Sequence, residues 1–111
     1  MSASQYERDY KHQLEARGWT VFRSAGSLAI DLIALKGKLI MLIEVKSFSG
    51  DVFSVRKRAK TLLQWYEMLK LNKKFPVYYA LRKKGQKTFR LVNPGILKKP
   101  YHWSKMAQPA K

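Results

Sequence analysis

The segment at residues 39–46, Leu-Ile-Met-Leu-Ile-Glu-Val-Lys, most constrains what this chain can fold into. It begins with five consecutive apolar residues, so an extended backbone would present apolar side chains on both faces. Such a strand belongs in the middle of a sheet that is covered on both sides. A second apolar segment, residues 29–36, precedes it across Gly37, and the two together predict a β-hairpin.

The rest of the sequence predicts helices and strands around this hairpin. Ser4 and Glu7 match a capping box that opens a helix, and Gly18 is a natural residue after its end. Further elements are predicted as strands at 19–23, 75–82 and 88–92 and a helix at 55–72, with loops at 24–27 and 47–54. The order helix, three strands, helix, two strands predicts an α/β domain whose sheet lies between helices.

Length and composition predict one small domain and exclude several classes of site. The chain has 111 residues, no cysteine and two histidines far apart, which excludes disulfide scaffolds and thiolate or histidine zinc clusters. The longest unbroken apolar run, residues 39–43, is too short to cross a membrane, and we expect a cytoplasmic protein. We assign residues 1–94 to the domain and 95–111 to a basic tail rich in Lys and Pro, for which disorder is one interpretation.

The positive charge lies almost entirely in the second half of the chain. Residues 1–51 carry seven Lys or Arg and six Asp or Glu, whereas residues 52–111 carry sixteen and one. A surface of this sign attracts a polyanion, and nucleic acid is the polyanion that we expect. Charge by itself indicates a partner and no activity.

Two acids and a lysine form the pattern that predicts chemistry. Side chains alternate along a strand, so Glu44 and Lys46 lie on one face and Val45 on the other. Asp31 lies in the adjacent segment of the predicted hairpin, between apolar residues. Carboxylates in such surroundings need a cation or hydrogen-bond donors. Asp31 and Glu44 therefore predict a site for a hard divalent cation such as Mg²⁺, which would activate water against a phosphate, with Lys46 beside it.

Asp31, followed by Glu44-Val45-Lys46, resembles the D…ExK signature of the PD-(D/E)XK nuclease superfamily. Together with Glu7-Arg8, residues 23–27 and Ser47, it resembles the archaeal-type Holliday junction resolvases over roughly residues 5–82. The resemblance implies a restriction-endonuclease-like mixed β-sheet of about five strands flanked by helices. It also implies a homodimeric endonuclease that nicks branched double-stranded DNA in pairs, using Mg²⁺ for which Mn²⁺ can substitute. No membrane and no small-molecule substrate is expected.

The same resemblance implies roles for individual residues. Glu7, Asp31, Glu44 and Lys46 would be catalytic. Asp31, Glu44 and the backbone carbonyl of Val45 would bind the metal, with Glu7 reaching it through water. Arg8, Arg23 and Ser27 would contact DNA. Ile30 stands where the superfamily signature has a proline, which many members also lack, and the segment after Pro94 has no counterpart in the family.

The remaining DNA contacts are predicted from the basic runs of the second half. Arg56, Lys57, Lys60 and Lys83 would contact backbone phosphates, which gives affinity without reading sequence. For the dimer, the surfaces that we consider are the helix at 55–72 and the strand that contains Tyr78 and Tyr79.

Each assignment has a structural alternative. Glu7 can serve the capping box alone, Asp31 can lie solvated on an edge strand, and Glu44 can form an ion pair with Lys46. The basic residues can be ordinary surface cations, and Ser27 a turn residue. At the level of function, the alternatives are another PD-(D/E)XK nuclease that cuts flaps or splayed DNA, and a basic nucleic-acid-binding module without catalysis.

Overall fold

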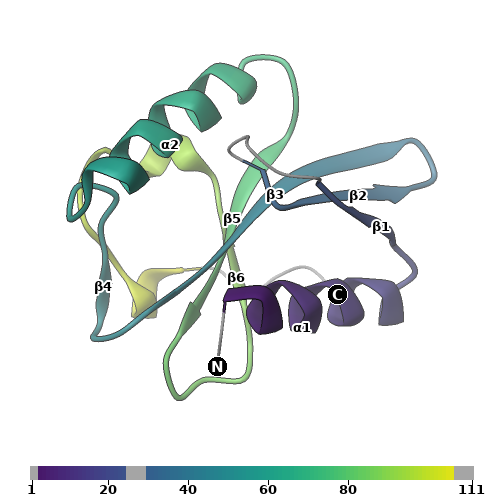
Figure 1. Ribbon diagram of the computed structural model, residues 1–111, viewed down its shortest axis with the longest axis horizontal. Helices are drawn as coiled ribbons and strands as arrows, with labels where there is room; N and C mark the ends of the chain where they lie inside the picture. The colour runs from purple at the N-terminus through teal and green to yellow at the C-terminus, as the bar shows by residue number, and fades with distance from the viewer. Residues whose placement is uncertain (1–2, 25–29, 107–111) are drawn as a thin grey trace.

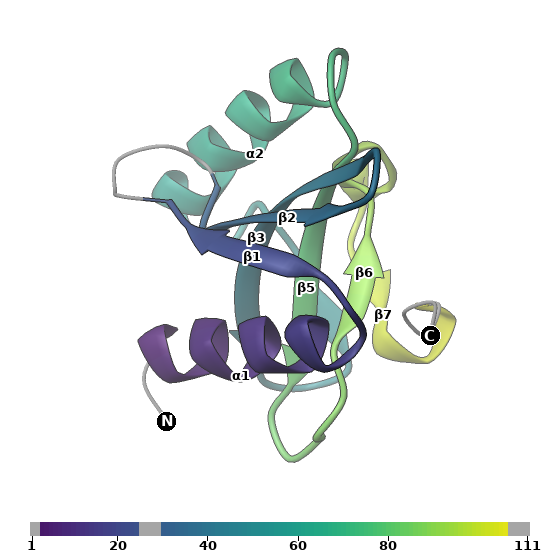
Figure 2. The ribbon, with the colours of Figure 1, turned by 90° about the vertical axis from the view of Figure 1, so that its right-hand side faces the viewer.

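A five-stranded sheet with one α-helix on each side forms the body of the protein (Figures 1 and 2). The computed structural model describes residues 3–24 and 30–106. Along the chain the elements are α1 (Ala3–Ala16), β1 (Thr20–Arg23), β2 (Leu32–Lys36), β3 (Leu39–Phe48), β4 (Val52–Phe53), α2 (Ala59–Leu71), β5 (Val77–Lys83), β6 (Arg90–Val92), the 3₁₀ helix η1 (Pro94–Lys98), β7 (Tyr101–His102) and the 3₁₀ helix η2 (Trp103–Lys105). None of these described helices has the length and hydropathy to cross a membrane.

The apolar strand β3 is central, as its sequence predicts. The strand order is β1-β2-β3-β5-β6, and β3 pairs antiparallel with β2 and parallel with β5. The parallel pairing requires a crossover connection, and the segment that contains α2 provides it. Figure 2 shows α1 and α2 on opposite sides of the sheet, so both faces of β3 are covered. The predicted α/β fold with a mixed sheet of about five strands flanked by helices is confirmed.

Alternation along β3 divides the interior into two apolar clusters. Ile43 and Val45 belong to the cluster on the α1 side, where Tyr10 and Leu14 of the helix are buried. Leu42 packs in the cluster on the α2 side. Glu44 and Lys46 continue the alternation of Leu42, so β3 directs both of them toward the α2 side of the sheet.

Several boundaries differ from the sequence-based prediction. The loop predicted at 47–54 contains the end of β3 and strand β4, and the strands predicted from residues 75 and 88 begin at Val77 and Arg90. The strand predicted from residue 29 begins at Leu32, although the backbone N–H of Asp31 still donates to the carbonyl of Ile43 over 2.9 Å. The helix predicted from residue 55 begins at Ala59, because Arg58 is extended at φ −136° and ψ 138°. The apolar side chain of Val55, which suggested an earlier start, is buried in the core instead.

The segment after Pro94, which we assigned to a tail, packs against the domain over its described residues. Leu97, Trp103 and Met106 are buried in the α2-side cluster. Strand β7 pairs with β4, and the Arg90 guanidinium lies 4.4 Å from the Trp103 ring centre. The apolar residues that lie between the lysines of this segment are buried against the domain. Residues 95–106 are therefore part of the folded unit. Residues 107–111 lie outside the described residues.

We expect Trp103→Ala to destabilise the protein by about 3 kcal/mol, because it removes a large buried aromatic side chain. Urea denaturation measures the change. His102→Ala, at the adjacent exposed position, is the control and should stay within about 0.5 kcal/mol of the parent. Equal, small effects of both substitutions would show that the C-terminal segment does not contribute to the core.

Candidate active site

Asp31, Glu44 and Lys46 meet at one end of the hairpin, on the side of the sheet that faces α2. The N–H of Asp31 donates to the carbonyl of Ile43, which places Asp31 beside the residue that precedes Glu44. A cavity of about 470 Å³ opens here, and we call it the acid site. The residues that line it are Asp31, Glu44, Lys46, Arg58, Lys60, Thr61 and Gln64.

Hydrogen bonds and an ion pair hold the two carboxylates in place. The backbone N–H of Val45 donates to Oδ2 of Asp31 over 2.9 Å. Nε2 of Gln64 donates to Oε2 of Glu44 over 2.5 Å, and Nζ of Lys46 lies 3.4 Å from the same oxygen. Because these groups come from β3 and α2, the fold itself determines where the carboxylates point.

Glu44 is the only buried charged residue among those that the structure describes, and it is 4% exposed. Burial raises its pKa to about 9, and the adjacent Asp31 adds to the rise through a hydrogen bond and through its charge, against the smaller opposing effects of Lys46 and Gln64. A protonated Glu44 can share its proton with Asp31. When both carboxyls are ionised, the buried Oε1 of Glu44 has no hydrogen-bond donor and the two groups repel each other.

These residues fit a hard divalent cation. A cation between Asp31 and Glu44 would remove their repulsion and supply a partner for Oε1 of Glu44. No group of three or more His, Cys, Asp or Glu side chains is placed for a metal within residues 3–24 and 30–106. Mg²⁺ does not require such a group, because it commonly binds one or two carboxylates and completes its shell with water and substrate phosphate. The donor set of the acid site is therefore sufficient for Mg²⁺.

Glu7 approaches the acid site from α1. Burial raises its pKa, and the charge of Asp31 raises it further, so the two carboxylates lie close enough to influence each other. Nη2 of Arg23 lies 3.9 Å from Oε1 of Glu7 and opposes this rise. Glu7 does not line the acid site itself. The water-mediated role that the family resemblance implies for Glu7 stays a prediction.

The structure separates the predicted DNA-binding residues into groups. Lys60 lines the acid site, and Lys57 lines an adjoining cavity. Arg56 is held elsewhere, with Nε donating to the carbonyl of Lys98 over 3.4 Å and the guanidinium 5.6 Å from the Trp65 ring centre. Lys83 forms an ion pair with Asp51.

Three predicted DNA contacts remain. Arg8 is exposed on α1 and lines neither cavity. Arg23 forms the ion pair with Glu7 and is otherwise largely exposed. Ser27 lies outside the described residues.

Three residues of the acid site were not predicted from the sequence: Arg58, Thr61 and Gln64. Thr61 and Gln64 line the site from α2, and Arg58 lines it from the position just before the helix. Lys60 and Gln64 are four residues apart and share one side of the helix. The apolar residues of α2 predict which side of the helix packs on the core. They do not predict which of the polar residues on either edge of that side lie near β2 and β3. The contact between Gln64 and Glu44 could therefore not be predicted from the sequence.

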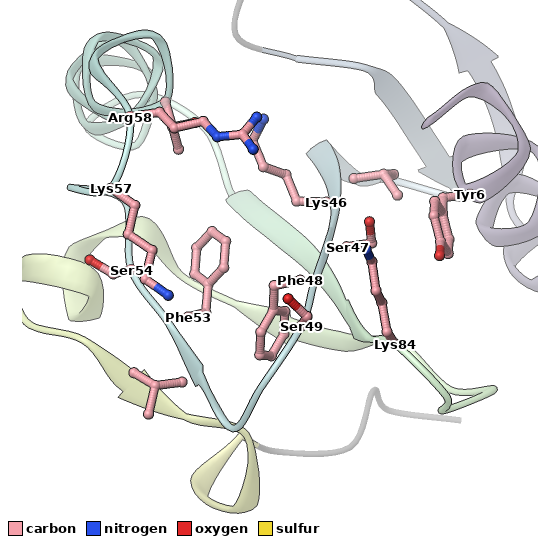
Figure 3. Close-up of a pocket in the computed structure, with 13 residues that line it drawn as sticks. Tyr6, Lys46, Ser47, Phe48, Ser49, Phe53, Ser54, Lys57, Arg58 and Lys84 are labelled. Atoms are coloured by element: carbon pink, nitrogen blue, oxygen red, sulfur yellow. The ribbon is translucent and has the colours of Figure 1, made fainter. Parts of the chain in front are cut away.

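A second cavity, which we call the basic cleft, adjoins the acid site (Figure 3). The two share Lys46, Arg58 and Thr61. The other residues that line the basic cleft are Tyr6, Val45, Ser47, Phe48, Ser49, Val52, Phe53, Ser54, Lys57 and Lys84. The cleft therefore lies between α1, the end of β3, β4 and the start of α2.

Comparison with known proteins identifies a family for this chain. Residues 2–104 match the family described as archaeal Holliday junction resolvase (Hjc). The crossover junction endodeoxyribonuclease Hjc of Methanocaldococcus jannaschii is 33% identical over 95 residues, which cover 85% of this chain and 67% of that protein.

Two solved structures have the same fold. The Holliday junction resolvase Hjc of Archaeoglobus fulgidus superposes with a TM-score of 0.72 at 20% identity, covering 95% of this chain and 89% of that one. The bacterial homing endonuclease I-Ssp6803I superposes with a TM-score of 0.62 at 12% identity, covering 96% and 80% of the two chains. At these identities the likeness establishes the fold alone.

The raised pKa of Glu44 predicts that the metal-free protein loses stability as the pH rises. Below about pH 4.5 the carboxyl is protonated in both states, and its favourable contribution is complete. As the pH rises toward about 9, the unfolded state releases this proton more readily, so the free energy of unfolding falls. Glu44→Gln removes the effect. In EDTA, urea denaturation should find the variant more stable than the parent at pH 8 and similar to it near pH 5. A difference that is constant with pH would contradict the assignment.

Proposed function

Because this chain belongs to the family of archaeal Holliday junction resolvases, it is a divalent-metal-dependent endonuclease of four-way DNA junctions, and we propose that Asp31, Glu44 and Lys46 form its active centre. The observation that carries this assignment is the meeting of two carboxylates beside the central strand β3, where Glu44 is buried with an oxygen that lacks a donor. A module that only bound DNA would gain nothing from burying an acid beside a phosphate. The costly placement of Glu44 supports a catalytic role.

The protein's own groups orient the reacting phosphate. The N–H of Val45 and the amide of Gln64 fix the carboxylates of Asp31 and Glu44 before substrate arrives. The ammonium of Lys46, which is partly exposed in the acid site, is placed to donate to a phosphate oxygen or to the attacking water. We assign Glu7, whose pKa is raised in part by the charge of Asp31, a water-mediated role beside these groups.

We propose Mg²⁺ as the metal, with Mn²⁺ as a substitute. Asp31, Glu44 and the backbone carbonyl of Val45 would hold it, an all-oxygen set that suits a hard cation. When bound, the ion polarises a phosphate oxygen and lowers the pKa of a coordinated water. With its raised pKa, Glu44 holds a proton near neutral pH when no metal is present. Because the charge of the ion favours ionised carboxylates, binding of the metal would release this proton.

We propose that the protein acts as a homodimer. Two symmetric nicks need two active centres related by a two-fold axis, which a C2 dimer supplies. Phe22 of β1 and Leu35 of β2 are 53% and 37% exposed, and both lie on the α2 side of the sheet. In Figure 1 these strands extend away from α2, so the helix does not cover them. This apolar face is our candidate interface. The other strand that we considered, with Tyr78 and Tyr79, is β5, which lies inside the sheet between β3 and β6. Tyr79 is buried in the core and Tyr78 is partly buried, so we favour β1 and β2.

Glu44→Gln or Asp31→Asn should reduce cleavage of a labelled four-way junction in Mg²⁺ by at least about 100-fold, because each removes a charge from the reacting site. Binding in EDTA should be unchanged for Glu44→Gln, because this carboxyl already holds a proton near neutral pH when no metal is present. It should be unchanged or tighter for Asp31→Asn, which removes a negative group near phosphate. Glu67→Gln, on the exposed side of α2, is the control and should cut normally. Cleavage by Glu44→Gln at near the parent rate would refute the assignment.

Phe22→Asp combined with Leu35→Asp should convert the dimer to a monomer in analytical ultracentrifugation, because two charges would be buried at the interface. Leu63→Asp, at a 65% exposed position of α2, tests the other candidate surface. If the double variant stays dimeric and Leu63→Asp becomes monomeric, the interface lies on α2 and not on β1 and β2.

A further inference from the structure

The basic cleft adjoins the acid site, and the two cavities share three lining residues. Figure 3 shows Lys57 and Arg58 on one side of the cleft and Tyr6 and Lys84 on the other, with Lys46 between them. Arg58 and Lys46 point toward each other where the two cavities join. Any group that occupies the cleft lies next to the phosphate that the acid site would hold.

The charge of the cleft is positive and unbalanced. No Asp or Glu lines it among the described residues. Lys57, Arg58 and Lys84 have no carboxylate partner within residues 3–24 and 30–106, whereas the neighbouring Lys83 pairs with Asp51 and Arg82 with Asp9. Acidic residues therefore lie near the end of β5, but they pair with Arg82 and Lys83, which do not line the cleft. Cations that converge without a counter-charge indicate an anionic ligand.

The size of the cleft selects the form of that ligand. A cavity of about 470 Å³ can hold a phosphate group with an adjoining sugar, so it suits the backbone of one DNA strand. The hydroxyls of Ser47, Ser49 and Ser54 can donate to phosphate oxygens, and Phe48 and Phe53 offer apolar surface to a sugar.

We propose that the basic cleft binds the phosphate next to the scissile one, on a single DNA strand that leaves the acid site. Lys57 and Lys84 approach this phosphate from opposite walls, and Arg58 lies between it and the reacting phosphate. The inference rests on the proposed function, because it takes the acid site as the place of cleavage. It adds a second, specific phosphate contact to the proposed active centre.

The test is a chemical double-mutant cycle that does not require cleavage. Junctions carry one neutral methylphosphonate at a time, at each phosphate around the branch point, and affinities are measured in EDTA. The protein variants are Lys57→Ala/Lys84→Ala and a control of equal charge, Lys38→Ala/Lys74→Ala. Lys38 and Lys74 precede β3 and β5, so they lie at the opposite end of these parallel strands from the cleft. All four lysines are exposed, and circular dichroism should find both variants folded.

One methylphosphonate should weaken binding of the parent and of the control variant about tenfold while leaving the Lys57/Lys84 variant without further loss. Cleavage mapping in Mg²⁺ should then find the coupled phosphate next to the cut. Additive effects at every position would overturn the proposal, as would coupling to a phosphate remote from the cut. Because binding is measured without metal, coupling without any cleavage would refute the active centre and not the cleft, whereas cleavage without coupling would refute the cleft alone.

Discussion

The structure depends on the burial of one carboxyl group beside another. Glu44 lies on a face of β3 that otherwise packs against apolar residues, and Asp31 is adjacent to it. Such a pair is unfavourable when both groups are ionised, so the surrounding donors and the sheet must hold it together. Without a cation the pair retains a proton near neutral pH, and with a cation it can release that proton. The same feature thus weakens the folded state and prepares a place for the metal.

The central features of the fold follow from local sequence. Apolar residues on both faces of β3 require a central position, and the break at Gly37 requires a hairpin. Because alternation along a strand is strict, it also predicts that Glu44 and Lys46 share a face. Their placement beside Asp31 then follows from hairpin pairing. The heart of the candidate site could therefore be predicted without knowledge of any distant contact.

What could not be predicted depends on contacts between distant segments. The rotation of α2 about its axis, which brings Gln64 to Glu44, is set by packing against β3, β5 and η1 and not by the helix sequence alone. The two-residue strands β4 and β7 are too short to leave a periodic signal, and each exists because the other pairs with it. The segment after Pro94 was predicted to be a tail because lysine and proline are frequent in it. Only a few apolar residues, among them Leu97, Trp103 and Met106, hold it to the domain.

The pairing of β4 with β7 links the end of the chain to the entrance of the basic cleft. Val52, Phe53 and Ser54 form part of the cleft wall, and β7 is the strand that holds β4 in place. The C-terminal segment thus supports one wall of the basic cleft from behind, although none of its described residues line the cleft. Substitution or truncation in this segment would therefore displace β4 and change the shape of the cleft through which a DNA strand reaches the proposed active centre.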